Sequence, residues 1–264
     1  MSSMAEPEIF YRVHRKPRMS VAMFGEYMAA EDDERETVAR NAKFAKTARA
    51  VTYKQARGVL RSFITSDRRD LRILYDAIES WKAEVGNPKN PPEGKDELQA
   101  CIEALESVLS NYNALGFGTL STSRAPHRQP HVTIEGVNVS AQLDAMLHAT
   151  ERSGEKRIGG IHFQLSKGKA EGKKDETKTK RDKAGTYSSV LILRHVEQNF
   201  IDLGVARYDL CIIANVRKGR VWVAPENHKR MFNRIDAAAR TIRSSWNNIS
   251  PPADFDPAKA RFVD

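Results

Sequence analysis

The stretch RIGGIHFQLSKGKAEGKKDETKTKRDKAGTYSSV, Arg157 to Val190, changes its residue pattern twice. Alternating apolar and polar residues at its start predict a β-strand, because successive side chains of a strand point to opposite faces. A lysine-rich run of alternating charges follows, and it is too polar to pack in a core. We therefore expect a strand, a mobile charged loop over residues 167–183, and a helix over residues 186–201 that begins near Thr186.

The segments before this stretch extend the sheet. VTIEGVNVSAQLDAML, residues 132–147, also alternates, and it is read as one bent strand or as two separate strands. TERSGEK, residues 150–156, is typical of a turn. An antiparallel hairpin follows from this arrangement, with Asp144 opposite Phe163 or Gln164.

The segments after it complete a mixed α/β pattern. YDLCIIANV, residues 208–216, is nearly all apolar, which indicates a central strand buried on both faces. Helical periodicity covers residues 96–115 before the strands and residues 227–246 after the short strand VWVAP. The expected fold class is α+β or α/β, with a mixed sheet flanked by helices.

The rest of the chain divides by composition. Residues 1–19 predict a flexible basic arm, and residues 20–85 predict a helical region. GNPKNPPEGK, residues 86–95, is rich in proline and glycine and is typical of a linker. A mixed-sheet domain is expected over residues 96–250, followed by a loosely ordered tail over residues 251–264.

The charge of the chain favours a polyanionic partner. The formal net charge is +9 and the pI is about 9.5. Each phosphate that a lysine or arginine neutralises releases counterions, so a nucleic acid, DNA or RNA, is the expected partner. The basic residues that we expect to contact it lie on two predicted helices and in the charged loop: Arg57, Arg61, Arg68, Arg69, Lys169, Lys173, Lys174, Lys178, Lys180, Arg181 and Lys183.

Several classes of protein are disfavoured. No apolar run approaches the ~18 residues that span a membrane. Cys101 and Cys211 lie far apart in apolar patterns, which predicts buried reduced thiols and a cytoplasmic location. The sequence contains no phosphate loop, no Gly-x-Ser-x-Gly elbow and no zinc-ligand spacing.

The predicted order of elements is helix, three strands, helix, strand, and it resembles the core of the PD-(D/E)XK nuclease superfamily over about residues 96–224. The resemblance implies a restriction-endonuclease-like core. It also implies hydrolysis of phosphodiester bonds with Mg²⁺ held by carboxylates, ligands that suit a hard cation. Members of this superfamily often act in restriction, repair or defence against mobile elements. A role of this kind is expected here only by analogy of fold.

The resemblance assigns roles to individual residues. Asp144 matches the first acid of the family and would bind the metal, with Glu103 and Glu106 of the first helix as additional ligands. Gln164 stands where a second acid is expected. The residue two positions on is Ser166 rather than lysine, and Lys167 comes one position later, where it would stabilise the phosphate. Three further residues would support this active site: Ser166, Tyr187 and Gln198.

Three functions remain compatible with these residues. The first is a magnesium-dependent nuclease with Asp144, Gln164 and Lys167 in its active site. The second is a catalytically inactive subunit of nuclease fold that binds nucleic acid or a partner protein within a larger complex, which the missing Glu-x-Lys pair favours. The third is a structural adaptor whose apolar helices dock on a larger assembly.

Overall fold

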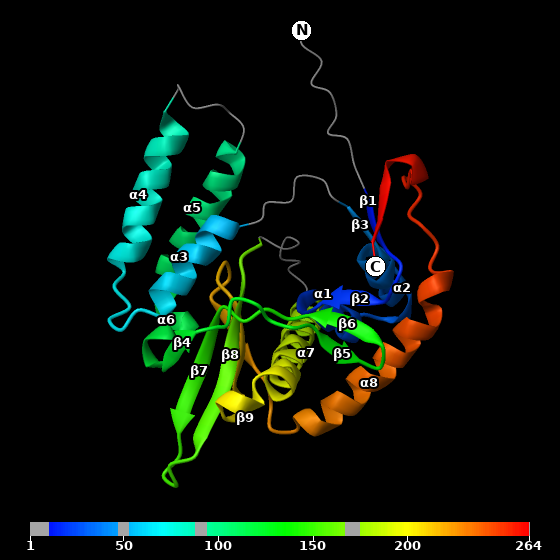
Figure 1. Cartoon of the computed structure of the whole chain (residues 1–264). Helices are drawn as coiled ribbons and strands as arrows, with labels where there is room; N and C mark the ends of the chain where they lie inside the picture. The colour runs from blue at the N-terminus through cyan, green and yellow to red at the C-terminus, as the bar shows by residue number, and fades with distance from the viewer. Residues whose placement is uncertain (1–10, 47–52, 88–93, 167–174, 264) are drawn as a thin grey trace.

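The apolar segment predicted as a central strand forms β9 (Val205–Asn215), which lies within a five-stranded sheet. The computed structural model describes residues 11–46, 53–87, 94–166 and 175–263 (Figure 1). The strand order of this sheet is β10–β9–β8–β7–β4. The four other strands are β10 (Arg220–Val223), β8 (Lys156–Gln164), β7 (Ala145–Thr150) and β4 (Thr122–Arg124).

One face of this sheet is covered by the helix that joins β8 to β9. These two strands run parallel, whereas the other neighbouring pairs are antiparallel. Parallel neighbours need a long crossover connection, and α7 (Asp175–Asn199) supplies it. Cys211 and Ile213 of β9 are buried in the core that this helix shares with the sheet.

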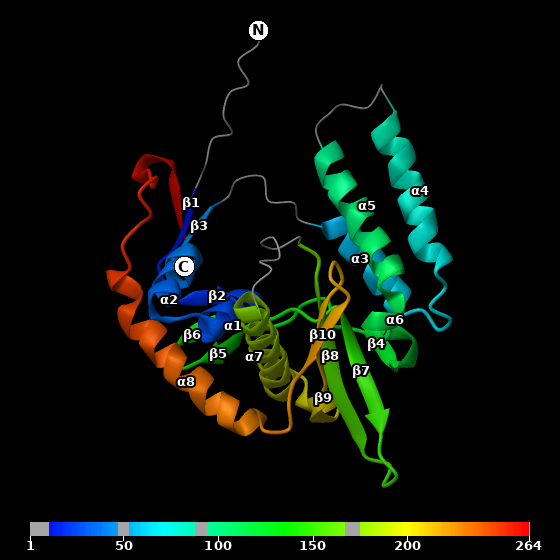
Figure 2. The ribbon, with the colours of Figure 1, turned by 180° about the vertical axis from the view of Figure 1, so that it is seen from behind.

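The opposite face is covered by helices that precede the sheet in the chain. These are α3 (Lys54–Ile64), α4 (Arg72–Gly86), α5 (Lys95–Ser110) and α6 (Tyr112–Leu115). Ile212 and Ala214 alternate with Cys211 and Ile213 along β9, and they are buried against these helices. Figures 1 and 2 show α3–α5 and α7 on opposite sides of the sheet, which gives three layers.

Two smaller sheets stand beside α7, on its side away from the large sheet (Figure 2). Their strand orders are β2–β6–β5 and β11–β1–β3. The strands are β1 (Tyr11–His14), β2 (Arg18–Ser20), β3 (Phe44–Lys46), β5 (Val132–Ile134), β6 (Val137–Ser140) and β11 (Ala260–Val263). The helices around them are α1 (Val21–Ala29), α2 (Asp32–Lys43) and α8 (His228–Ser245). Short 3-10 helices lie at η1 (Phe117–Thr119), η2 (Ile201–Leu203), η3 (Trp246–Asn248) and η4 (Pro257–Lys259).

The structure confirms the general class, a mixed α and β fold with helices around a mixed sheet, and corrects the prediction for both ends of the chain. Within the segment predicted as a flexible arm, residues 11–19 contain β1 and most of β2, and Tyr11 and Met19 are 1% exposed. The predicted tail contains β11, which pairs with β1. The reason is that each end supplies the other's hydrogen-bond partners, and a pairing between opposite ends of a chain leaves no local pattern. Residues 1–10 lie outside the described residues.

The predicted helical region over residues 20–85 is divided between the two cores. Helices α1 and α2 pack in the core that contains α7, whereas α3 and α4 belong to the core on the other face of the large sheet. Helices α3 and α4 precede the predicted linker and α5 follows it, yet all three contribute to one core. Helical periodicity identified the helices, but it carried no information about which core each one joins.

The segment over residues 132–147, predicted as one bent strand or two separate strands, forms three strands in two sheets. Glu135 and Gly136 have positive φ angles of 49° and 85°, which close a tight hairpin between β5 and β6. The chain then leaves this hairpin and enters the large sheet as β7. A bend at residues 141–144 separates the two, so Asp144 directly precedes β7.

The helix predicted to begin near Thr186 begins at Asp175 instead. Residues 175–183 of the predicted charged loop are therefore helical, and residues 167–174 lie outside the described residues. Asp175 and Glu176 occupy the first turn, where acidic side chains interact favourably with the helix dipole. The charges that predicted a loop are those of a solvated helix start.

Two predictions about composition can be compared with the structure. Cys101 and Cys211 are both buried, and neither takes part in a disulfide. In the described part of the chain, no helix combines the length and the apolar character that crossing a membrane requires.

Candidate functional site

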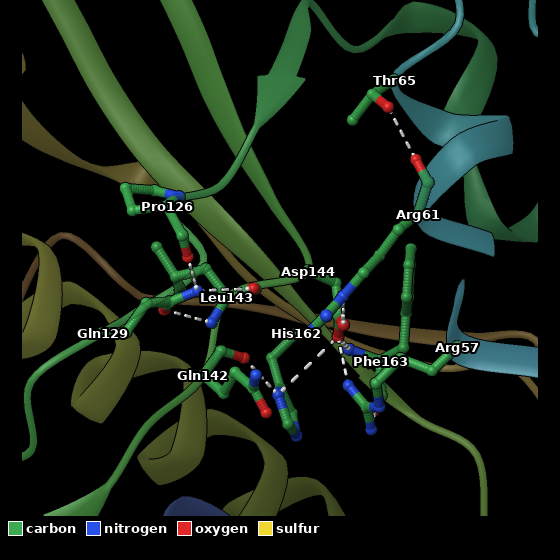
Figure 3. A network of polar contacts seen from close by, with 10 residues as sticks. All are labelled: Arg57, Arg61, Thr65, Pro126, Gln129, Gln142, Leu143, Asp144, His162 and Phe163. Atoms are coloured by element: carbon green, nitrogen blue, oxygen red, sulfur yellow. Dashed lines mark hydrogen bonds and ion pairs between the residues drawn. The ribbon is translucent and has the colours of Figure 1, made fainter. Parts of the chain in front are cut away.

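Asp144 lies at the start of β7 with its carboxylate fully buried beside β8 (Figure 3). Its backbone N–H donates to the Ile161 carbonyl oxygen at 2.7 Å, and its Oδ2 accepts a hydrogen bond from the Phe163 N–H at 2.7 Å. The hairpin pairs Ala145 with Ile161, so Asp144 stands one residue short of the predicted position opposite Phe163. The predicted contact between these two strands is therefore made through the side chain of Asp144 and the backbone of β8.

Two arginines from α3 bind the same carboxylate. Arg61 Nε donates to Asp144 Oδ1 at 2.8 Å, and Arg57 Nη1 donates to Asp144 Oδ2 at 2.5 Å. Arg57 also donates from Nη2 to the Phe163 carbonyl oxygen at 2.8 Å. The two arginines are four residues apart on one helix, a spacing that puts both side chains on one face. We refer to Asp144, Arg57 and Arg61 as the arginine clamp.

The arginine clamp holds more positive than negative charge. One carboxylate faces two guanidinium groups, and a guanidinium remains protonated in proteins. The Arg57 and Arg61 side chains are 22% and 35% exposed, whereas the Asp144 side chain is 0% exposed. Arg61 Nη2 is itself buried and has no hydrogen-bond partner among the described residues. The clamp is thus a cationic group that reaches solvent around a buried acid.

His162 lies beside the arginine clamp and is held by a backbone group. Its Nδ1 is 2.7 Å from the Gln142 carbonyl oxygen and 3.9 Å from Asp144 Oδ2. A contact with a carbonyl oxygen requires that Nδ1 carry the proton and donate it. Burial lowers the pKa of His162, although the Asp144 carboxylate opposes this change. His162 is therefore a neutral neighbour of the carboxylate rather than a third cation.

Gln129 holds the residue before Asp144 in place. It accepts a hydrogen bond from the Leu143 N–H at 2.7 Å and donates one to the Leu143 carbonyl oxygen at 2.9 Å (Figure 3). His195 of α7 is fully buried, and its Nε2 lies 3.2 Å from Gln129 Oε1. Asn199 donates a hydrogen bond to the Nδ1 of His195 at 2.9 Å. The loop, α7 and the start of β7 are thereby joined by one set of side-chain contacts.

The residues present do not fit the expected Mg²⁺ site. Both oxygens of Asp144 already accept hydrogen bonds from the clamp arginines and the β8 backbone. Glu103 is bound to Arg217 at 3.2 Å, and Glu106 to Lys82 at 2.7 Å. Within residues 11–46, 53–87, 94–166 and 175–263, no group of three or more His, Cys, Asp or Glu side chains could hold a metal ion. The two glutamates are held on α5 by other partners.

The second half of the predicted motif lies at the end of β8. Gln164 is the last residue of the strand, is half-buried, and pairs with Asn215 of β9. Ser166 is exposed and follows the strand, and Lys167 lies outside the described residues. Gln164 and Asp144 thus belong to neighbouring strands, as predicted, but the positive charges near Asp144 come from α3.

The predicted supporting residues lie elsewhere. Tyr187 is 4% exposed and lines a cavity between α7 and α8, on the side of α7 away from the large sheet. Gln198 is exposed near the end of α7. Within the described residues, neither side chain forms a hydrogen bond or an ion pair with the arginine clamp.

The predicted nucleic-acid-binding residues that the structure describes differ in their surroundings. Arg57 and Arg61 belong to the arginine clamp. Lys180 forms ion pairs with Glu31, Glu34 and Glu176, and Arg69 donates to the Gly118 carbonyl oxygen. Lys178 and Arg68 are exposed, and Arg181 is half-buried. Lys183 lines the cavity between α7 and α8. The other three predicted residues, Lys169, Lys173 and Lys174, lie outside the described residues.

Sequence reasoning missed the clamp itself, along with Gln129 and His162. The available signal was the pair Arg57 and Arg61, whose spacing of four residues places two cations on one helix face. Nothing in the sequence connected that face to Asp144. No protein-family model and no curated protein sequence matches this chain.

Proposed function

We propose that this chain is a nucleic-acid-binding protein with a nuclease-like core in which arginines, rather than a metal, act at the position of the family's first acid. Its element order supports this proposal. The large sheet and its helices follow in the order α5, β4, β7, β8, α7, β9, with β5 and β6 of a small sheet between β4 and β7. β4 takes the place of the first predicted strand, which forms β5 of that small sheet. Asp144 directly precedes the second of these large-sheet strands and Gln164 ends the third.

The arginine clamp is the observation that carries the proposal. A carboxylate that ligates Mg²⁺ must offer oxygen lone pairs to the ion, and both Asp144 oxygens are bound by guanidinium groups. A guanidinium group has five N–H donors in a planar fork that matches phosphate oxygens. Asp144 thus orients two arginines, and their remaining donors can bind a phosphate.

The charge of the whole chain supports the same partner. A net charge of +9 raises the local concentration of a polyanion and speeds its association. Binding of this kind depends steeply on salt, since it is driven by counterion release. The second function left open by the sequence, a catalytically inactive subunit of nuclease fold, is therefore the one that we favour. Association with a larger complex is compatible with it.

A combined binding and cleavage assay tests the proposal. Single- and double-stranded DNA and RNA are titrated at several salt concentrations, and each is also incubated with Mg²⁺, Mn²⁺ or EDTA. We expect salt-sensitive binding and no cleavage in any metal. Metal-dependent cleavage that is lost in Asp144→Asn would overturn the proposal in favour of the nuclease. A failure to bind any of the four nucleic acids would overturn it in favour of the adaptor.

Variants of the arginine clamp sharpen the test. Arg61→Gln should weaken binding about tenfold and lower the slope of log affinity against log salt by about 1. Arg61→Lys keeps a charge beside Asp144 and should weaken binding less. Arg152→Gln, in the exposed turn between β7 and β8, is the matched control and should change affinity less than twofold. Circular dichroism of each variant separates lost binding from lost folding.

A further inference from the structure

A cavity of about 330 Å³ lies between α7 and the first two turns of α8. Figures 1 and 2 show these helices on the side of the molecule away from α3–α5, so the cavity is separate from the arginine clamp. Ligand pockets in proteins begin at about this volume. The residues that line it are Lys183, Thr186, Tyr187, Asn227, Arg230, Met231 and Arg234.

Three cations line this cavity without an anionic partner. Lys183, Arg230 and Arg234 are exposed, and none of them forms an ion pair or a side-chain hydrogen bond within the described residues. The acids near them in the sequence are bound elsewhere or do not line the cavity. Asp182 binds Arg220 and Trp222, Asp236 binds Arg194, and Glu226 is outside the lining.

The position of Arg230 on α8 is electrostatically unfavourable without a ligand. Arg230 lies in the first turn of α8, which contains no acidic residue. Cations near a helix N-terminus are repelled by the positive end of the helix dipole, and an anion there is favoured. An anion bound in the cavity would satisfy both the dipole and the three side chains.

Beside the polar residues Thr186 and Asn227, the lining offers the apolar surfaces of Tyr187 and Met231. Tyr187 is 4% exposed and Met231 is half-buried. The Tyr187 hydroxyl has no hydrogen-bond partner among the described residues. A tyrosine ring and a methionine sulfur both make favourable contacts with a planar aromatic group. Inorganic phosphate would contact only the three cations.

We propose that the cavity between α7 and α8 binds a nucleotide, with Lys183, Arg230 and Arg234 on its phosphate and Tyr187 and Met231 against its base. The nucleotide is either free or the phosphorylated end of a nucleic acid strand, since the chemistry of the two is the same at this site. The site does not depend on the arginine clamp, so it stands even if the clamp binds no phosphate.

Calorimetric titration of the full chain tests this site. The probes are nucleoside monophosphates, a 5′-phosphorylated oligonucleotide, the matching unphosphorylated nucleoside, and inorganic phosphate alone. We expect the nucleotide to bind at least tenfold more tightly than either the nucleoside or inorganic phosphate. Equal affinity for nucleotide and nucleoside would overturn the role of the cations. Equal affinity for nucleotide and inorganic phosphate would overturn the role of Tyr187 and Met231, and no binding of any probe would overturn the site.

Three substitutions on α8 assign the binding. Arg230→Ala and Arg234→Ala should each weaken nucleotide affinity about tenfold, because each removes a charge-assisted hydrogen bond. Lys229→Ala is the matched control, since Lys229 is exposed on the same helix and does not line the cavity. An equal loss in Lys229→Ala would mean that only general charge matters, which contradicts the proposal.

Two further readouts separate this site from the proposed function. Without ligand, Arg230→Ala should raise the melting temperature, because a cation is removed from the helix N-terminus. Arg61→Gln should leave nucleotide affinity unchanged, whereas it should weaken binding of long nucleic acids. The oligonucleotide arm, run in Arg61→Gln so that the arginine clamp contributes less, distinguishes the two sources. Tighter binding of the 5′-phosphorylated strand than of the same strand without the phosphate indicates a strand end, and equal binding of the two strands beside tighter binding of the monophosphate indicates a free nucleotide.

Discussion

Gln129 binds both polar atoms of the Leu143 peptide backbone, with its Oε1 2.7 Å from the Leu143 nitrogen and its Nε2 2.9 Å from the Leu143 oxygen. Gln129 lies in the loop before β5, and Leu143 is the residue before Asp144. The pair therefore fixes the bend through which the chain leaves the small sheet and enters the large one. The position of Asp144 depends on a side chain that is distant in sequence and has no charge.

Replacing Gln129 should destabilise the protein. In Gln129→Ala the buried Leu143 N–H loses its acceptor, and an unsatisfied buried donor costs about 1–3 kcal/mol. We expect a loss of about 2 kcal/mol in the free energy of unfolding, measured by urea denaturation. Gln142→Ala is the control, because the Gln142 side chain is exposed and its contact with His162 uses the backbone oxygen. Equal effects of the two changes would contradict the role of Gln129.

Removing the charge of Asp144 should cost more. Asp144→Asn leaves two guanidinium groups without their counter-ion beside a fully buried side chain, and breaking such a pair costs about 3–5 kcal/mol. Since the arginines are partly exposed, we expect a loss near 3 kcal/mol. The control is Asp70→Asn, which removes a solvent-screened ion pair with Arg72 and should cost clearly less than Asp144→Asn.

A double-mutant cycle tests whether Asp144 and Arg61 act together. In Asp144→Asn/Arg61→Gln, the second substitution removes one of the uncompensated charges that the first one leaves. The double variant should therefore be less destabilised than the sum of the single variants, by about 1 kcal/mol or more. Additive losses in chemical denaturation would mean that the two side chains stabilise the fold independently.

The stability of the protein should fall in mild acid because of His195. Burial lowers the pKa of this histidine to about 4, against about 6.5 in an unfolded chain. Between these values the unfolded state binds a proton that the folded state does not, so stability decreases as the pH falls from about 6.5 to about 4. The full effect is on the order of 3 kcal/mol.

Unfolding measured at several pH values in wild type and His195→Gln checks this expectation. The wild-type curve should lose stability over that interval, and the variant should lose clearly less. Four other histidines with a lowered pKa, His14, His131, His148 and His162, change stability in the same direction and remain in both proteins. His127→Gln, at an exposed position, is the control and should keep the wild-type slope. An unchanged slope in His195→Gln would refute the assignment.

Two helical glycines should respond oppositely to alanine. A Cβ at Gly185 of α7 would lie 2.2 Å from the Trp222 ring, so Gly185→Ala should force α7 away from β10 and destabilise the protein by about 1–3 kcal/mol. A Cβ at Gly58 of α3 would meet no atom within 4 Å, and Gly58→Ala should stabilise the protein by about 0.5–1 kcal/mol. Thermal unfolding of both variants provides the comparison, and a shift of the same sign in both would contradict it.

Local patterns in the sequence were sufficient for most single elements. The alternation in β8, the apolar run in β9 and the periodicity of α5 and α8 all predicted the structures that form. Each of these patterns reflects which side of one strand or helix is buried, and neighbouring residues alone determine it. The start of α7 was missed because charges at a solvated helix end look the same as charges in a loop.

The sequence by itself determined the mixed α and β class, the apolar strand β9 inside the sheet and the acid that precedes β7. The tertiary structure alone decided what that acid does. Arg57 and Arg61 lie 87 and 83 residues before Asp144, and β1 pairs with β11 from the opposite end of the chain. Partners so distant leave no periodic signal, because ion pairs and strand pairs depend on how whole elements pack. Asp144 therefore reads in the sequence as a metal ligand, and in the fold it is the anion that holds two arginines.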